Sequence, residues 1–202
     1  MKVAVLVSGT GTNLQALLDA SREPTYPARV VLVGCNRASA AAIARAETAG
    51  VPVSVADRRD YPRRVERQGL LLNAVRRAEA ELVVLAGFDE ILSQEFVAAY
   101  AGRMINTHPS LLPAFGGTLH AVAQALEHGV KVTGCTVHLV TDDLDGGPIL
   151  FQQCVEVLDD DDIESLHARI RAEEHRLVCR AVRALAEGRV RVEGRVARVI
   201  RS

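Results

Sequence analysis

The sequence predicts an α/β protein, built as a single domain around a twisted, mostly parallel sheet with helices on both faces. Short, almost continuously apolar runs recur at residues 2–7, 29–34 and 82–86, and helical segments separate them. Strands that helices cover on both faces have this pattern. The chain has 202 residues, of which 49% are hydrophobic, so it is long enough for one complete core. These observations favour a Rossmann-like fold with a mixed edge.

The expected elements follow one another without a linker or an internal repeat. Strands are expected at residues 2–7, 29–34, 51–56, 82–86, 134–140 and 149–157, and a further short strand begins at Met104. Helices are expected at about residues 14–20, 39–49, 63–80 and 163–187, another ends near Glu127, and residues 189–200 form a hairpin. In the helix at 63–80, most arginines are expected to face solvent, and the buried side is expected to comprise Val65, Leu71, Leu72 and Val75.

Charge and cysteine content narrow the classes of function. Lys and Arg number 24 against 25 Asp and Glu, and this balance gives no reason to expect nucleic acid as a partner. The apolar run at residues 3–7 is too short for a signal peptide or a membrane span, so we expect a cytoplasmic protein without membrane contact. The cysteines are scattered, which favours buried free thiols over a disulfide framework or a zinc site. No histidine pair has metal-ligand spacing, so no metal is expected.

The strand that begins at Met104 carries the strongest catalytic signal. Asn106 and His108 are two residues apart, so on an extended backbone both side chains point to the same face. A carboxamide and an imidazole are both hydrogen-bond donors, and paired donors suit the oxyanion that develops in acyl transfer. Pro109 and Pro113 stiffen the loop that follows. The alternative is an ordinary strand end with a solvated Asn and His.

An acidic, glycine-rich loop follows the strand at residues 134–140. It contains Asp142, Asp143 and Asp145, the last directly before a glycine pair. One of these carboxylates is expected to lie against His108, where it would keep the imidazole protonated or relay a proton. The alternative is a plain acidic turn.

The first strand leads into a glycine turn and then a helix, which is an arrangement that binds phosphate. Gly9 and Gly11 fit this role, but Leu14 stands where a dinucleotide-binding loop has its third glycine. A single phosphate is therefore expected rather than a pyrophosphate. The alternative is a plain strand-to-helix turn in which Asn13 caps the helix.

Asn106, His108 and Asp145, with the run His-Pro-Ser-Leu-Leu-Pro that starts at His108, resemble the signature of the folate-dependent formyltransferases. The resemblance runs nearly end to end. It implies one formyltransferase domain at residues 1–202, with a phosphate-binding half at 1–100 and a catalytic and folate-binding half at 101–202. It also implies that the formyl group of 10-formyltetrahydrofolate passes to the amine of 5′-phosphoribosylglycinamide, with Asn106, His108 and Asp145 as catalytic residues.

The resemblance also assigns the binding residues. The residues for the phosphorylated acceptor are Gly11, Thr12, Asn13, Arg171 and Glu174. The residues for the folate are Arg64, Leu85, Asp89, Glu90, Ile91, Leu92, Asn106, Thr141, Asp142, Asp143 and Leu144. The family usually has Met-Arg where this chain has Asp89 and Glu90, so we expect like-charge repulsion of an acidic folate tail there.

Several alternatives stay open. A tRNA formyltransferase and a folate-deformylating hydrolase share the signature, but each usually carries an extra domain for which 202 residues leave no room. A non-catalytic module that binds a nucleotide phosphate would explain the glycine loop alone. Monomer and homodimer are both compatible with the sequence. Because the glycine turn after the first strand, the segment at residues 85–92 and the loop at residues 106–117 all follow strands, we expect these three to converge at the carboxyl edge of the sheet.

Overall fold

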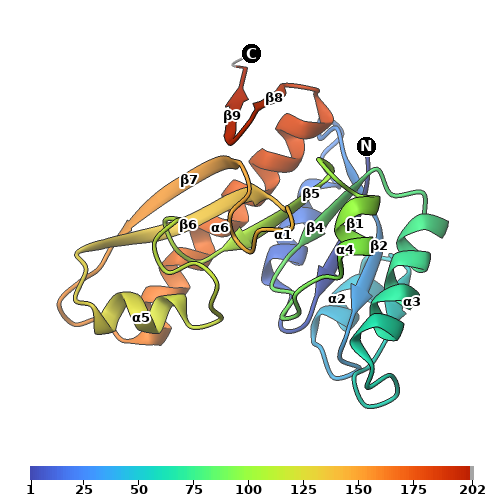
Figure 1. The fold of residues 1–202 in the computed structure, drawn as a ribbon, viewed down its shortest axis with the longest axis horizontal. Coiled ribbons are helices and arrows are strands. Elements are labelled where there is room, and N and C mark those ends of the chain that lie inside the picture. Colours follow the sequence, from blue (N-terminus) through green and yellow to red (C-terminus); the bar gives the residue numbers. More distant parts are fainter. Residues whose placement is uncertain (201–202) are drawn as a thin grey trace. The chain divides into compact units, whose positions relative to one another are not determined.

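The computed structural model describes residues 1–200. Its backbone forms two compact units, the first ending at Ile105 and the second beginning at Asn106. Figure 1 shows the elements of both units in sequence colours. Each unit is built around strands with helices packed against them.

The first unit contains four parallel strands in the order β3-β2-β1-β4. The strands are β1 Lys2–Val7, β2 Arg29–Cys35, β3 Val53–Val55 and β4 Leu82–Leu85. The helices are α1 Thr12–Ala20, α2 Ala42–Thr48, α3 Arg64–Arg77 and α4 Gln94–Ala99. Figure 1 shows β1 and β2 between α1 on one side and α3 on the other. The nearly continuous burial of β1 and β4 follows from this cover on both faces.

The second unit carries the mixed part of the sheet. Its elements are α5 Ala121–Glu127, β6 Val132–Leu139, β7 Ile149–Glu156, α6 Ile163–Ala186, β8 Val190–Glu193 and β9 Val196–Val199. β6 and β7 pair antiparallel, β7 and β9 pair parallel, and β8 and β9 close an antiparallel hairpin. α6 packs along β6 and β7 (Figure 1). β5, Met104–His108, begins in the first unit and delivers its last three residues to the second.

The elements confirm the predicted fold class and most of the predicted boundaries. Two corrections concern helices. α4 was not predicted, although Ser93 caps it by accepting a hydrogen bond from the N–H of Phe96. In α3 the predicted buried residue Val65 is 68% exposed, whereas Leu71, Leu72 and Val75 are buried as predicted. Within residues 1–200, no helix is both long enough and apolar enough to cross a membrane.

Candidate active site

Three side chains of the second unit meet where β5 ends. Asn106 and His108 lie on one face of β5, and Asp145 approaches them from the loop between β6 and β7. Asp145 Oδ2 lies 3.5 Å from His108 Nδ1, and Asp145 Oδ1 lies 3.4 Å from Asn106 Nδ2. The structure therefore brings together the three residues for which the sequence predicts catalysis.

Both ring nitrogens of His108 have an acceptor beside them. Nε2 lies 2.8 Å from the main-chain oxygen of Phe115, and Nδ1 faces Asp145. A carbonyl oxygen only accepts, so Nε2 carries a hydrogen. A protonated ring would satisfy Phe115 and Asp145 at once, and it would be almost fully enclosed, because the side chain of His108 is only 6% exposed.

His138 on β6 is a fourth member of this cluster. Its Nδ1 lies 2.9 Å from the carbonyl oxygen of Leu139, and its Nε2 lies 3.2 Å from Asn106 Nδ2 and 3.5 Å from Asp145 Oδ1. A neutral His138 accepts from Asn106 at Nε2, and a protonated one donates to Asp145. In the neutral state, His138 therefore fixes which end of the Asn106 amide faces Asp145.

Asp145 is held in its ionised form by its surroundings. Burial alone would raise the pKa of Asp145, but a hydrogen bond from His138, the N–H of Gly117 and the nearby charge of His108 together lower that pKa below its ordinary value. The Gly117 N–H donates to Oδ2 at 2.8 Å. Asp145 has a φ of 53°, and the next two glycines allow close packing there, because a Cβ on Gly146 would meet Asp143 and one on Gly147 would meet Leu139.

The loop after β5 is tied to the β6–β7 hairpin through one hydroxyl. Thr136 Oγ1 donates to the carbonyl oxygen of Ser110 at 2.7 Å and accepts from the N–H of Leu112 at 3.0 Å. Gln152 donates to Thr136 Oγ1 at 3.0 Å and to the Leu112 carbonyl at 2.9 Å. Four polar contacts therefore fix the loop directly downstream of His108.

In the first unit, the predicted phosphate loop opens α1. Gly11 stands at the N-cap in the left-handed region, with φ 70° and ψ 33°, and the helix starts at Thr12. The alternative in which Asn13 caps the helix is wrong, because Asn13 already lies inside the first turn. Arg45 braces the loop by donating to the carbonyl oxygen of Thr10 at 2.8 Å. The first N–H groups of α1 have no partner within the helix, so this turn suits an anion.

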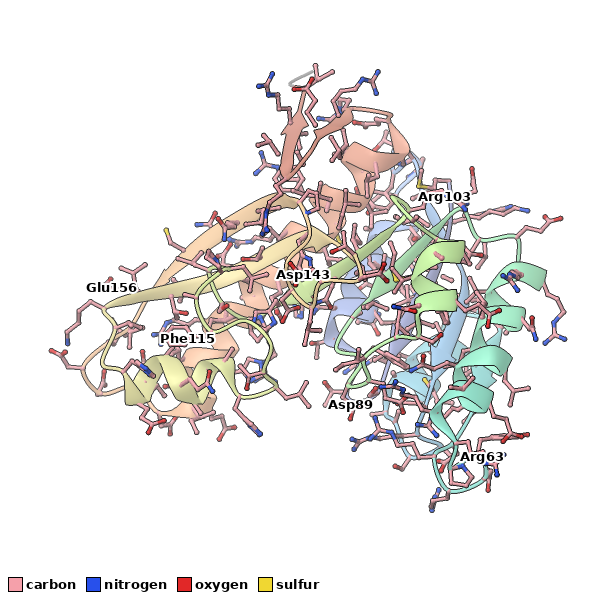
Figure 2. The ribbon with its side chains drawn as sticks, in the orientation of Figure 1. Arg63, Asp89, Arg103, Phe115, Asp143 and Glu156 are labelled. Carbon is pink, nitrogen blue, oxygen red and sulfur yellow. The ribbon has the colours of Figure 1, made fainter. Side chains whose placement is uncertain are left out.

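Asp89 and Glu90 follow β4 and lie among basic and amide side chains of the same unit (Figure 2, where Asp89 is labelled). Asp89 pairs with Arg37 and Arg58, and its N–H donates to Ser8 Oγ at 3.0 Å. The Glu90 side chain is 7% exposed and pairs with two arginines, at 2.8 Å each. Both carboxylates are thus compensated by internal partners, which the sequence did not indicate.

These contacts also set the pKa values of the pair. Burial would raise the pKa of Asp89, but hydrogen bonds from Ser8 and Asn36 and the charges of nearby arginines lower it. The pKa of Glu90 is likewise lowered against burial, mainly by hydrogen bonds from Arg67 and Gln68. Both groups are therefore carboxylates at neutral pH.

The other predicted binding residues fall into two groups. Arg64, at the start of α3, and Ile91 are exposed, Leu92 is half-buried, and Leu85 is packed in the core at 7% exposure. In the second unit, the exposed residues are Thr141, Asp142, Asp143 and Leu144, whereas Arg171 is half-buried and Glu174 is buried on α6. Their binding roles, and the convergence of the three loops, stay predictions.

Sequence reasoning missed two kinds of participant. Phe115 and Gly117 act through main-chain atoms, which no side-chain pattern indicates. Arg67 is 6% exposed although it lies in a helix whose arginines were expected to face solvent. Within residues 1–200, no group of three or more His, Cys, Asp or Glu side chains is arranged to hold a metal ion.

An amide, an imidazole and a carboxylate at a strand end of an α/β sheet define a site suited to acyl transfer. The model of the formyl transferase family matches residues 1–182. The chain therefore belongs to the formyl transferase family.

Individual proteins are similar to the chain over nearly its full length. The chain is 52% identical over 196 residues to the phosphoribosylglycinamide formyltransferase of Mycobacterium tuberculosis, covering 97% of this chain and 90% of that protein. It is 44% identical to the trifunctional purine biosynthetic protein adenosine-3 of Homo sapiens, where it covers 95% of this chain but spans only 19% of that protein. The crystal structure of glycinamide ribonucleotide transformylase 1 from Symbiobacterium toebii superimposes with a TM-score of 0.96 at 47% identity, covering 100% of this chain and 94% of that one.

Proposed function

We propose that this protein transfers the formyl group of 10-formyltetrahydrofolate to the amine of 5′-phosphoribosylglycinamide, a step of de novo purine (IMP) synthesis. The single observation that carries the proposal is the cluster of Asn106, His108 and Asp145, in which the Asp145 carboxylate lies 3.4 Å from Asn106 Nδ2 and 3.5 Å from His108 Nδ1. Its membership of the formyl transferase family and its likeness to a phosphoribosylglycinamide formyltransferase over most of both chains support this choice.

In this proposal the acceptor binds through its phosphate. The turn formed by Gly11, Thr12 and Asn13 supplies main-chain N–H groups at the start of α1. Arg171 supplies a guanidinium for the phosphate, and Glu174 an acceptor for a ribose hydroxyl. The folate-binding roles go to Arg64, to the segment from Leu85 to Leu92, and to the loop of Thr141, Asp142, Asp143 and Leu144. Asn106 also contacts the folate.

The catalytic steps follow from the donors at the end of β5. The amine attacks the formyl carbon, and the formyl oxygen becomes an oxyanion. Asn106 and protonated His108 donate hydrogen bonds to that oxygen. Asp145, kept ionised by its neighbours, stabilises the imidazolium and assists removal of the proton from the amine. When the tetrahedral intermediate collapses, the bond between the formyl carbon and N10 of the folate breaks, N10 takes up a proton, and tetrahydrofolate leaves.

The contacts of His108 add a requirement to this mechanism. Its Nε2–H is held by the Phe115 carbonyl and its Nδ1 faces Asp145, so donation to substrate needs an exchange of one partner. Such exchanges are common, since catalytic hydrogen bonds often form only in the complex with substrate.

The wider assignments belong to the same proposal. They are a cytoplasmic location, small-molecule substrates without a nucleic-acid or membrane partner, and a monomer or homodimer. No metal takes part. Residues 1–202 act as one formyltransferase domain, with phosphate binding in residues 1–100 and catalysis and folate binding in residues 101–202.

The test is a spectroscopic assay of folate deformylation with and without phosphoribosylglycinamide, on the wild type and His108→Ala. We expect deformylation that requires the acceptor and that falls by about a hundredfold to a thousandfold in the variant, the usual cost of one oxyanion donor. His167→Ala, on α6, is the matched control and should keep wild-type turnover. Deformylation without acceptor would instead indicate a hydrolase. Phosphate binding without any transfer would indicate a binding module.

A further inference from the structure

We propose that Glu90 is a positioning residue for the formyl donor: its carboxylate anchors the main chain of residues 90–93, so that Ile91 and Leu92 present a fixed surface to the folate ring. The inference rests on the proposed function, because it assigns a role to one residue of the predicted folate segment. It differs from the expectation that Glu90 acts through its charge on an acidic folate tail.

Glu90 is the point where three other segments of the first unit meet. Its Oε1 accepts from Asn36 Nδ2 at 3.0 Å and from Arg58 Nε at 2.8 Å. Arg67 Nε donates to the same oxygen at 2.9 Å, and Gln68 Nε2 donates to Oε2 at 3.2 Å. These donors come from the end of β2, the loop after β3 and the helix α3.

The same helix also holds the main chain on the far side of Glu90. Gln68 Nε2 donates to the carbonyl oxygen of Ile91 at 3.0 Å, and Gln68 Oε1 accepts from the N–H of Ser93 at 2.7 Å. Gln68 is 1% exposed, so water does not replace these contacts. The main chain at residues 91–93 is therefore fixed from α3, while the side chain of Ile91 stays 59% exposed.

Removing the Glu90 charge would disrupt the contacts that hold the segment at residues 90–93. Arg67 is 7% exposed at its side chain, so without the carboxylate a buried guanidinium loses its counter-charge, which is among the more damaging changes in a protein interior. In Glu90→Gln, one carboxylate oxygen becomes an NH₂ group. That group cannot accept from the donors that now meet there, so the segment has to shift.

A positioning role of Glu90 and a direct effect of its charge on the folate tail predict different results when that charge is removed. Arg37, Arg58 and Arg67 face the two carboxylates of Asp89 and Glu90, which leaves one net positive charge. If Glu90 repelled an acidic folate tail, removing its charge would tighten binding, and more so for a longer tail. If Glu90 positions the segment, the same change weakens binding of every donor by one factor.

The experiment compares Glu90→Gln with the wild type, using the monoglutamate and triglutamate forms of 10-formyldideazafolate as donors. We expect the KM of both donors to rise by the same factor, roughly tenfold, which is below the hundredfold that a misplacement of about 1 Å costs. The KM of phosphoribosylglycinamide and the pH profile of kcat should stay unchanged. Calorimetric titration of the donor on the same proteins gives its Kd without turnover.

Two further variants complete the design. Arg58→Met removes a partner whose side chain is 35% exposed, so it should fold normally and raise the donor KM by a smaller factor. Glu95→Gln removes the same charge from an exposed position in the first turn of α4 and should leave donor binding unchanged. An unchanged Kd in Glu90→Gln, or tighter binding of the triglutamate alone, would overturn the inference. Absence of transfer by the wild type would instead count against the proposed function, and the Kd comparison would still decide the role of Glu90.

Discussion

At the residue scale, Gly11 is the position of the predicted phosphate loop where a side chain is least tolerated. Its φ is 70°, and a Cβ there would lie 2.6 Å from the Cβ of Ala42 and 2.9 Å from its Cα. Gly11→Ala must therefore push the loop away from α2. We expect a loss of about 1–3 kcal/mol in the free energy of unfolding, as for other overpacked sites. The KM for the phosphorylated acceptor should also rise, which steady-state kinetics and urea unfolding would measure.

Gly9→Ala is the matched control for this prediction. A Cβ on Gly9 meets no heavy atom within 4 Å. We expect its free energy of unfolding to stay within about 0.5 kcal/mol of the wild type. Equal stability of the two variants would show that the contact with Ala42 does not constrain the loop.

Side-chain patterns in the sequence predicted only part of the candidate site. The spacing of Asn106 and His108 was enough to predict a shared face, because alternation along a strand is a local property. The third predicted residue, Asp145, does lie against both. The contacts with Phe115 and Gly117 were beyond prediction, since they depend on main-chain atoms placed by a loop with positive φ at both residues.

At the element scale, β6 holds the loop after β5 through Thr136. Thr136→Val keeps the shape of the side chain but removes the acceptor for the Leu112 N–H and the donor to Ser110. The Leu112 N–H would stay buried without a partner, so we expect a loss of about 1–3 kcal/mol. Because the same loop follows His108, kcat should fall as well. Thermal unfolding and the transfer assay would measure the two effects.

The same strand provides the control. Thr133 is 2% exposed, and its Oγ1 is buried without a hydrogen-bond partner in the structure. Thr133→Val therefore removes an unsatisfied polar atom, and we expect equal or higher stability with unchanged kcat. A comparable loss of stability in both variants would mean that the Thr136 network contributes nothing specific.

Helix α3 shows what an element's sequence can and cannot predict. The helical spacing of its apolar residues correctly predicted that Leu71, Leu72 and Val75 are buried. The same helical spacing puts Arg67 on the buried face, but an arginine is expected to be exposed to solvent unless it has a buried partner. That partner, Glu90, lies 23 residues further along the chain, so only the tertiary structure reveals that the arginine turns inward while Val65 stays exposed.

At the scale of the whole molecule, buried carboxylates determine how stability depends on pH. The pKa values of Asp89, Asp145 and Glu90 are all lowered in the folded protein, from ordinary values of 3.8 for Asp and 4.5 for Glu. A carboxylate with a lowered pKa contributes stability above its unfolded pKa and loses it as pH falls through the folded one. His167 acts in the same direction below 6.5, because burial and the charge of Arg171 lower its pKa.

We therefore expect the free energy of unfolding to decrease slightly below pH 6.5, where His167 begins to titrate, and steeply below about pH 4.5, where the carboxylates do. Urea unfolding at a series of pH values between about 3 and 8 would measure this. Glu90→Gln should lower stability at neutral pH and flatten the acid limb, because a neutral amide has no carboxylate proton to take up. A variant that lost stability by the same amount at every pH would show that Glu90 stabilises the fold by shape alone, and the ionised state of its cluster would then be irrelevant to folding.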